Sequence, residues 1–338
     1  MPVTVPVLNL TANIYSLRGE TSAHALENQA KLLAGLENRA RVESVKSSNA
    51  IEGIVTSDER ICAIVSSGAL PLTHDEAEIA GYNDVLRLIY REYASISFDE
   101  KTVRAMHKKM LAKSGASDAG IYKSADNLIL EYSACGEKKI RFRPVPAKDT
   151  KSAMQQMFLA YAQARDNPDI NPLLLIPCVV LDFLCIHPFR DGNGRISRLI
   201  SLLLLYKAGF TAGQYISFEA KIDRAKELYY TELKASSVGW NENKSDYLPF
   251  IEFFQRMLYE SYLDLNICMK EAVSGSKAFR IEQEVFSAIT PVSKAEICKA
   301  LPDVSPTTVE AVLGKLVREG RVEKSGAARS TKYFRKED

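Results

Sequence analysis

The segment His187-Pro188-Phe189-Arg190-Asp191-Gly192-Asn193-Gly194-Arg195-Ile196-Ser197-Arg198 decides the fold of this 338-residue chain. Long apolar stretches flank it, at 173–186 before and 199–206 after. Both are too long for single strands and predict buried helices. Between them, Asp191-Gly192-Asn193-Gly194 is a strong turn signal. The sequence therefore predicts a helix, a tight loop and a second helix at the centre of a mainly α-helical fold.

The loop has the properties of an anion site. It ends where the second helix begins, and free backbone N–H groups together with the positive end of the helix dipole favour an anion there. Gly192 and Gly194 allow the backbone to approach a phosphate without an intervening Cβ. Arg195 and Arg198 lie three residues apart, on one helix face, and the planar fork of arginine donates two parallel hydrogen bonds to a phosphate.

Two further side chains of the segment can carry chemistry. Asp191 offers a hard oxygen ligand, which suits Mg²⁺ held jointly by one carboxylate and the substrate's phosphates. His187 follows the first helix, titrates near neutral pH and can accept a proton from a hydroxyl. Each feature alone has an ordinary alternative: a helix-capping histidine, surface arginines or a plain turn. Their combination at this spacing favours a phosphate site.

The segment resembles the full signature of Fic-domain proteins, H-x-F-x-[D/E]-G-N-G-R-x-x-R, and fills every specified position. The resemblance implies a Fic (Fido) helical core and protein adenylyltransferase activity, in which AMP passes from ATP to a Tyr, Thr or Ser hydroxyl. The roles it implies are His187 as general base, Asp191 as ligand of Mg²⁺ (or Mn²⁺), Gly192, Asn193 and Gly194 as anion hole, Arg195 and Arg198 as ligands of the outer phosphates, and Phe189 as the core residue that fixes the nucleotide loop.

A second motif, Ser48-Asn49-Ala50-Ile51-Glu52-Gly53, resembles the inhibitory motif [S/T]-x-x-x-E-[G/N] of the same family. A helix would place Ser48 and Glu52 on one face because they lie four residues apart. In the family, the glutamate pairs with the second arginine of the signature, here Arg198, and displaces the γ-phosphate of ATP. Taken without the signature, Glu52-Gly53 is an ordinary helix stop.

Residues 120–143 predict a β-hairpin. Its first arm is formed by the apolar and aromatic ranges 120–123 and 128–132, and its second arm by 140–142. The turn between the arms is Cys135-Gly136-Glu137. The hairpin resembles the family's flap, which aligns the target's backbone by strand pairing; a hairpin without that role is the alternative.

The pair Tyr229-Tyr230, followed by Leu233, resembles the family's Y-Y-x-x-L, in which an aromatic ring lines the adenine pocket. Two core tyrosines on a helix are the alternative.

The chain divides into an N-terminal helical region (1–113), a Fic core (114–272) and a C-terminal unit (278–338). Residues 1–20 are expected to be extended and irregular, 21–113 helical, and 273–277 a linker. The C-terminal unit predicts helices at 281–289, at 293–301 with a Ser293–Glu296 capping box, and at 305–319. Strands follow at 321–324 and 331–335, around Gly326. Three helices and a hairpin resemble a winged helix (α+β), which often places its third helix in the DNA major groove.

Charge and cysteine content narrow the class of protein. The net charge of +2 gives no global field for nucleic acid. From Arg280 to Asp338 there are 11 Lys and Arg against 9 Asp and Glu, so contact with a protein is as good an alternative as DNA. The six cysteines have no C-x-x-C spacing and predict free buried thiols in a reducing, cytoplasmic compartment.

No targeting or membrane segment is expected. The N-terminus lacks a basic region of the kind that begins a signal peptide. The apolar stretch before His187 is interrupted by Pro177 and Asp182 and is too short to span a bilayer.

Two rival functions follow from the same residues. Glu52 can instead position a water, so that the site removes AMP from a target, or the winged helix can make the chain a DNA-binding regulator. The candidate partners are ATP, a target protein on the flap, DNA or protein on the winged helix, and a second copy of the chain in a homodimer.

Overall fold

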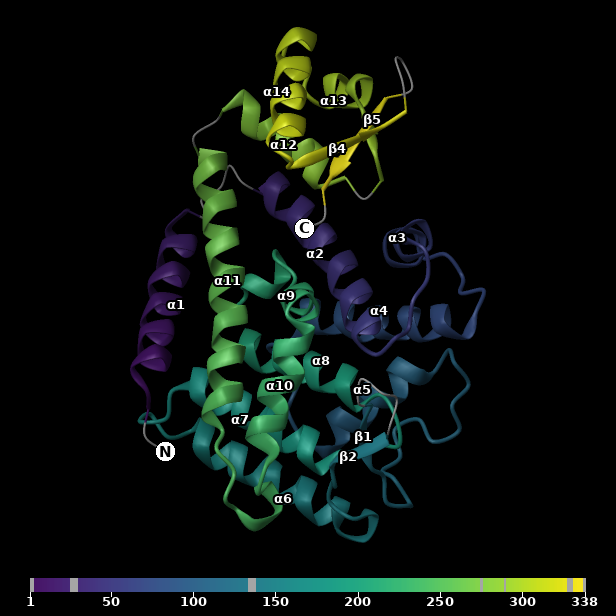
Figure 1. Cartoon of the computed structure of the whole chain (residues 1–338), viewed down its shortest axis with the longest axis vertical. Helices are drawn as coiled ribbons and strands as arrows, with labels where there is room; N and C mark the ends of the chain where they lie inside the picture. The colour runs from purple at the N-terminus through teal and green to yellow at the C-terminus, as the bar shows by residue number, and fades with distance from the viewer. Residues whose placement is uncertain are drawn as a thin grey trace.

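The structure, a computed structural model, describes residues 3–24, 30–132, 138–273, 276–288, 290–326 and 331–336. Within them the chain forms fourteen α-helices and five short strands (Figure 1). The helices are α1 (Val5–His24), α2 (Ala30–Ile51), α3 (Asp58–Ser67), α4 (His74–Glu92), α5 (Glu100–Leu111), α6 (Ala147–Arg165), α7 (Pro172–Ile186), α8 (Asn193–Lys207), α9 (Phe218–Arg224), α10 (Lys226–Ser237), α11 (Leu248–Val273), α12 (Lys277–Phe286), α13 (Lys294–Ala300) and α14 (Pro306–Arg318). The strands are β1 (Ile129–Tyr132), β2 (Lys138–Phe142), β3 (Val292–Ser293), β4 (Val322–Ser325) and β5 (Lys332–Arg335).

Helices α7 and α8 confirm the predicted helix–loop–helix. Asn171 caps α7 by accepting a hydrogen bond from the Leu173 N–H at 2.9 Å, and Pro172 takes the first helical position, where its missing N–H costs nothing. Almost every residue of α8 is buried, including the whole apolar stretch 199–206, so this helix lies in the middle of the protein. The loop between the two helices is therefore held at both ends by the main core.

The N-terminal residues correct the expectation of an extended segment, because Val5–His24 form α1. Figure 1 shows α1 lying alongside the long helix α11. Val7 and Ile14 are fully buried, and the Thr11 hydroxyl donates to Gln255 Oε1 at 3.2 Å. The sequence of α1 has little amphipathic pattern of its own, so this tertiary contact is what stabilises the helix.

The predicted β-hairpin is confirmed: β1 and β2 pair antiparallel, with Leu130 opposite Ile140, and its role as the family's flap stays a prediction. It is shorter than expected, because residues 121–128 form a loop rather than a strand. This loop bonds to the core: the Lys123 N–H donates to the Pro188 carbonyl at 2.9 Å, and Asp126 Oδ1 accepts from the Ala147 N–H at 2.7 Å. The predicted turn at Cys135-Gly136-Glu137 lies outside the described residues.

The C-terminal unit contains the three predicted helices and has an apolar core of its own, built from α12, α13, α14 and β4. The Ser293–Glu296 capping box is present. The first helix ends at Phe286 rather than at 289. The two-residue strand β3 was not predicted. It pairs with β5, as β4 does. A strand this short leaves no period-2 pattern in the sequence. The turn after Gly326 and linker residues 274–275 lie outside the described residues, and the winged-helix assignment stays a prediction.

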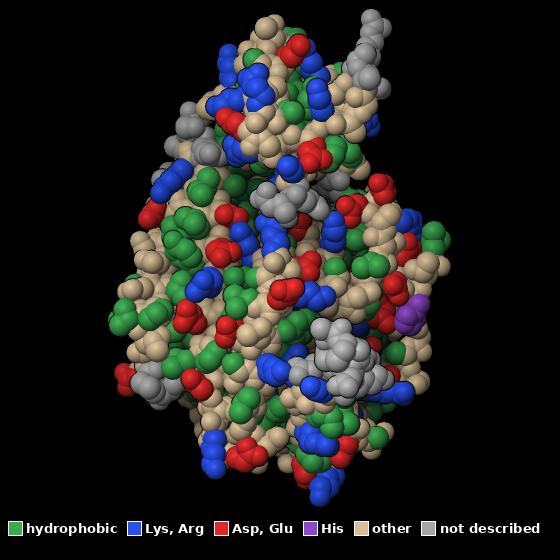
Figure 2. Space-filling view, in the orientation of Figure 1, with side chains coloured by type: hydrophobic (Ala, Val, Ile, Leu, Met, Phe, Trp, Pro, Cys, Tyr) green, Lys and Arg blue, Asp and Glu red, His purple; other side chains and the backbone are tan. Residues whose placement is uncertain are grey.

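The visible surface carries Lys, Arg, Asp and Glu side chains interspersed, as the small net charge leads one to expect (Figure 2). No helix in the described ranges combines the length and apolarity needed to cross a membrane. Cys178, Cys185 and Cys298 are free thiols, and Cys135 lies outside the described residues.

The contact between α4 and α5 requires a glycine. A Cβ added at Gly81 would lie 1.8 Å from the Met110 carbonyl oxygen, which belongs to backbone and cannot move aside cheaply. We expect Gly81→Ala to lower the free energy of unfolding by about 2 kcal/mol or more, measured by urea denaturation. Gly314→Ala is the matched control: nothing lies within 4 Å of its added Cβ, and an alanine inside α14 should stabilise by about 0.5–1 kcal/mol. Equal effects of the two substitutions would contradict the packing argument.

Candidate functional site

His187 ends helix α7 in a left-handed conformation, with φ of 52°, and its N–H donates to the Phe183 carbonyl at 2.9 Å. Its ring Nδ1 lies 3.2 Å from the Leu184 carbonyl oxygen. A carbonyl only accepts, so Nδ1 carries the proton and the Nε2 lone pair stays available. Burial lowers the pKa of His187 to about 4, against the opposing effect of the Leu184 contact. The imidazole is therefore neutral at physiological pH, the form that accepts a proton.

Phe189 and Asn193 lock the loop that follows. Asn193 Oδ1 accepts from the Phe189 N–H at 2.9 Å, and Asn193 Nδ2 donates to the Phe189 carbonyl at 2.8 Å. The Phe189 ring is fully buried and stacks on the His107 ring at 3.8 Å between centroids. Both predicted site residues thus fix the loop through their side chains. The Asn193 side chain is 2% exposed and bonds to the Phe189 backbone from both its oxygen and its nitrogen, so the backbone N–H of Asn193 is the group expected to face an anion.

His107, on α5, supports the same loop and was missed by the sequence analysis. Its Nδ1 accepts from the Gly120 N–H at 2.8 Å, so the proton is on Nε2, which donates to the Asp191 carbonyl at 3.0 Å. Burial is the main cause of a lowered pKa at His107, which favours this neutral form. A histidine on the apolar face of a helix gives no sequence signal beyond core packing.

The N-terminus of α8 is the predicted anion site, and the carboxylate of Glu52, in the turn directly after α2, lies on it. Gly192 caps the helix with φ of 76°. A Cβ added at Gly194 would lie 2.1 Å from Glu52 Oε1, so the Glu52 carboxylate rests against the backbone where a phosphate is expected. Gly192 has a second reason to be glycine, since an added Cβ would meet the Met110 and His107 side chains at 2.8 and 3.4 Å.

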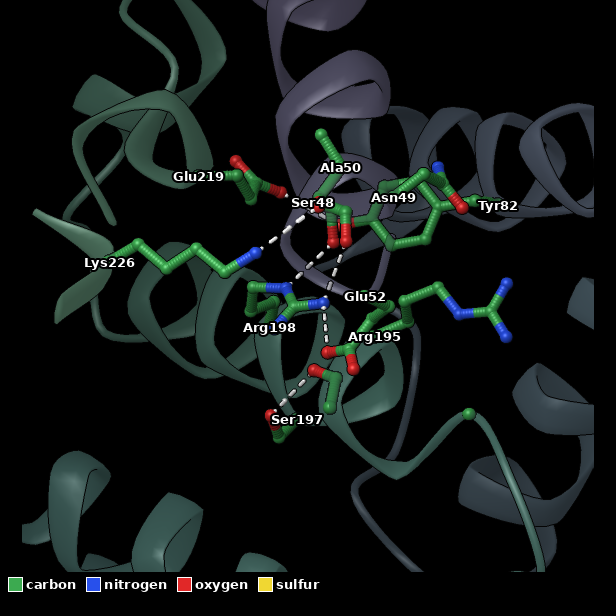
Figure 3. A network of polar contacts seen from close by, with 12 residues as sticks. Ser48, Asn49, Ala50, Glu52, Tyr82, Arg195, Ser197, Arg198, Glu219 and Lys226 are labelled. Carbon is green, nitrogen blue, oxygen red and sulfur yellow. Dashed lines mark hydrogen bonds and ion pairs between the residues drawn. The ribbon is translucent and has the colours of Figure 1, made fainter. Parts of the chain in front are cut away.

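Arg198 brings the two sequence motifs together (Figure 3). Its Nε donates to Ser48 Oγ, and its Nη2 donates to the Ser48 carbonyl and to Glu52 Oε1, each at 2.8 Å. The guanidinium is 2% exposed, and its Nη1 has no hydrogen-bond partner within the described part of the chain. Gly53, with φ of 81°, turns the chain away directly after Glu52.

Arg195 points elsewhere, as Figure 3 shows. It is 1% exposed and forms an ion pair with Glu78 of α4, while its Nη2 lies 3.9 Å from Asp191 Oδ2. The two guanidiniums, three residues apart on α8, thus turn to different acidic partners, Glu78 and Glu52, and their expected role as joint ligands of the outer phosphates stays a prediction. Neither is a surface charge.

Asp191 is the exposed member of the site, with 79% of its side chain accessible. Its Oδ1 accepts from the Gly192 N–H at 2.6 Å. Among the described residues, no three or more His, Cys, Asp and Glu side chains group together as a metal site. One accessible carboxylate beside an anion site nevertheless fits Mg²⁺ held jointly with substrate phosphates, which needs few protein ligands.

A buried network behind the site holds α2 in place. Ser44 Oγ donates to Glu219 Oε2 at 2.8 Å. The Tyr82 hydroxyl donates to Glu219 Oε1 at 2.9 Å, and Figure 3 labels both of these residues. Glu219 is fully buried, and burial raises its pKa. No motif marks these residues, because the contacts join α2, α4 and α9 over long sequence distances. They fix the helix that presents Glu52.

A pocket of about 570 Å³ opens beside these groups, between α10 and the flap. Tyr229 is buried and its ring centroid lies 5.2 Å from that of Tyr230. The Arg141 guanidinium lies 5.3 Å from the centre of the Tyr230 ring. The pocket is lined by Glu52, His187 and Gly194, by Ile129, Leu130, Arg141 and Phe142 of the flap, and by Leu184, Cys185, Tyr229, Tyr230, Thr231, Leu233, Lys234 and Ser237. Flat aromatic groups thus line the same cavity as the neutral histidine and the helix N-terminus.

Part of the chain matches a known protein family. Residues 97–205 match the Fic/DOC family. The chain contains a Fic domain. It is 26% identical over 226 residues to a protein adenylyltransferase Fic from Nematostella vectensis, covering 64% of this chain and 47% of that protein. Over 212 residues it is 24% identical to protein adenylyltransferase fic-1 from Caenorhabditis elegans, covering 60% of this chain and 37% of the relative. The chain thus spans less than half the length of these curated relatives.

Solved Fic proteins share the fold. A Fic family protein from Desulfovibrio desulfuricans G20 aligns with a TM-score of 0.62 at 20% identity, over 100% of this chain and 98% of the other. A Fic-domain signaling protein from Bacteroides thetaiotaomicron aligns with a TM-score of 0.64 at 21% identity, over 77% of this chain and 97% of the other.

The depressed pKa of His187 has a consequence for stability. Its folded pKa of about 4 lies below the usual value of 6.5, so the unfolded chain binds more protons between these pH values. Stability is then lost as pH falls from 6.5 toward 4. The free energy of unfolding of the wild type should fall when the pH is lowered from 7 to 4.5. We expect this fall to be smaller by about 2 kcal/mol in His187→Ala, which has no buried imidazole to protonate.

The free energy of unfolding is measured by urea denaturation at both pH values. The difference between the two values is then compared between wild type and variant. His74→Ala is the control, because the His74 side chain is 67% exposed. An acid loss that is the same in wild type and His187→Ala would contradict the burial argument.

Proposed function

We propose that the chain is a protein adenylyltransferase that transfers AMP from ATP to the hydroxyl of a Tyr, Thr or Ser in a target protein. The observation that carries the proposal is that neutral His187, the N-terminus of α8 and the Tyr229–Tyr230 pair line one cavity. These supply a base, an anion site and a surface for a planar ring. The names of the relatives point to the same chemistry.

In the proposed reaction, the target hydroxyl oxygen forms a bond to the α-phosphorus of ATP. The bond from that phosphorus to the bridging oxygen breaks, pyrophosphate leaves, and His187 Nε2 takes the hydroxyl proton. Asp191 would hold Mg²⁺, which supplies charge neutralisation on the phosphates. The amides at Gly192–Gly194 and the guanidiniums of Arg195 and Arg198 would orient the phosphate chain, and most of the rate enhancement would come from this positioning.

Glu52 would inhibit this reaction. Its carboxylate rests against Gly194 and holds Arg198 at 2.8 Å, so it takes both the space and the cation that the γ-phosphate needs. ATP bound beside it would be misplaced. The target would dock on the flap, since β1 and β2 border the same cavity.

One rival uses the same residues. Glu52 lines the cavity together with His187 and its side chain is 32% exposed, so it can accept a proton from a water and support removal of AMP. The decisive experiment offers ATP labelled at either the α- or the γ-phosphate, with a lysate as acceptor. AMP transfer labels protein from the α position only. Binding to a DNA duplex, measured in parallel, tests the regulator alternative for the C-terminal unit.

His187→Ala should abolish label transfer and leave ATP binding within about threefold of wild type. The imidazole handles the proton, whereas loop amides and arginines hold the phosphates. Protein labelling and ATP titration calorimetry are measured on the same preparation. Transfer by His187→Ala above a few per cent of wild type would show that another group is the base.

Glu52→Gly should raise AMP transfer about tenfold to a hundredfold. A charge-assisted arginine–carboxylate contact contributes about 1.5–3 kcal/mol, and about 1.4 kcal/mol corresponds to a factor of ten. Self-modification and lysate labelling provide the measurement. Arg198→Ala is the matched control, since it removes the same ion pair together with the phosphate ligand and should not activate. Equal transfer by wild type and Glu52→Gly would rule out inhibition through Glu52. A target that already carries AMP tests the rival function, removal of AMP. If wild type removes the AMP and Glu52→Gly does not, the rival is supported.

A further inference from the structure

We infer that Lys123 is a positioning residue for the proton-accepting histidine, holding the backbone on both sides of His187. The inference rests on the proposed function for the reaction that His187 serves. Lys123 lies in the loop between α5 and β1, within the segment 120–123 that the sequence predicted as the first arm of the hairpin, and its side chain has been given no role so far.

The contacts of Lys123 are directed at the end of α7. Its ammonium donates to the Ile186 carbonyl at 3.1 Å and to Asn127 Oδ1 at 2.8 Å, and its backbone N–H donates to the Pro188 carbonyl at 2.9 Å. The carbonyl groups immediately before and after His187 are therefore held by one residue. Asn127 adds to the clamp, because its Nδ2 donates to the Phe189 carbonyl at 3.3 Å.

The end of α7 needs such a clamp for two reasons. The last carbonyls of a helix have no partner within the helix, and a buried one requires a donor from elsewhere. His187 also adopts a left-handed conformation that residues other than glycine rarely take, so surrounding contacts must fix it. Lys123 is 7% exposed, and a cationic donor near a helix C-terminus is favourable in this poorly solvated setting.

Lys123 also acts on His187 by its charge. Desolvation is the main cause of the low pKa of His187, and the Lys123 charge lowers it further. Two other charged groups act on the ring: Glu52 raises its pKa and Arg141 lowers it. Burial lowers the pKa of Lys123 itself to about 8, against the opposing charge of Asp126. Below that pH the lysine is a cation, and its charge adds to the larger effect of burial on the pKa of His187.

The experiment compares Lys123→Met and Lys123→Arg in the activated Glu52→Gly protein. Lys123→Met keeps the chain length but removes donor and charge. We expect kcat to fall at least tenfold, while KM for ATP changes less than threefold because the phosphate ligands are untouched. Lys123→Arg keeps a donor and a charge and should restore most of kcat. Lys151→Met, which removes an exposed lysine of α6, is the control and should change neither constant.

The pH profile separates positioning from simple loss of folding. With the charge removed, the pKa of His187 should rise. The acid limb of the plot of kcat against pH then moves to higher pH in Lys123→Met. In Lys123→Arg it stays in place. A structural defect alone would reduce the folded fraction, which thermal melting measures. It would not move the acid limb of the kcat profile.

A second readout does not depend on activity. NMR titration of the ring of His187, assigned with His187→Ala among the four histidines, reports its pKa directly in each variant. If Glu52→Gly transfers no AMP, the proposed function fails, and the titration still tests Lys123. If Lys123→Met does not fold, Asn127→Ala takes its place, with an expected fall in kcat at unchanged KM for ATP. Unchanged kcat in the folded variant, or an unmoved His187 pKa in Lys123→Met, overturns the inference.

Discussion

The buried guanidinium of Arg198 is the constraint on which the arrangement of the site depends. A charge that is 2% exposed must have an ionic or hydrogen-bonding partner, because an unpaired buried charge is strongly destabilising. In the structure that partner set is the Ser48 hydroxyl and carbonyl and the Glu52 carboxylate. In the proposed reaction the γ-phosphate of ATP is negatively charged, like Glu52, and is an alternative partner for the Arg198 guanidinium. Helix α2 and the nucleotide therefore compete for one cation.

The competition is effective only if α2 cannot simply drift away. Its middle is bonded through Ser44 to Glu219, and its C-terminal carbonyl at Ala50 accepts from Lys226 Nζ at 3.4 Å. Its N-terminal half approaches the C-terminal unit, where the Arg39 guanidinium lies 6.0 Å from the centre of the Phe286 ring. One helix of 22 residues thus links the C-terminal unit to the carboxylate on the anion site. Breaking the Arg198 contact requires a change of side-chain conformation at Glu52 or a shift of the whole helix.

The sequence predicted the parts of the protein whose information is local. The apolar stretches around the loop and the Ser293–Glu296 cap were placed correctly, because periodicity and capping act within a few residues. Helix α1 was missed because contact with α11 stabilises it. His107, Lys123 and Glu219 were missed for a related reason. Each supports the site by contacts between elements distant in the chain, and a single histidine, lysine or glutamate has no pattern that reveals such a contact.

The state of His187 determines where control of the site can act. Its pKa of about 4 keeps the imidazole neutral throughout the physiological range, so changes in pH there do not switch the base on or off. A base of this strength also takes a proton less readily than one tuned near neutrality. The proposed reaction must then depend more on how accurately ATP and the hydroxyl are placed. Glu52 acts on that placement through Arg198 and Gly194, and Lys123 acts on the placement of the base, so both residues control geometry rather than the availability of a proton acceptor.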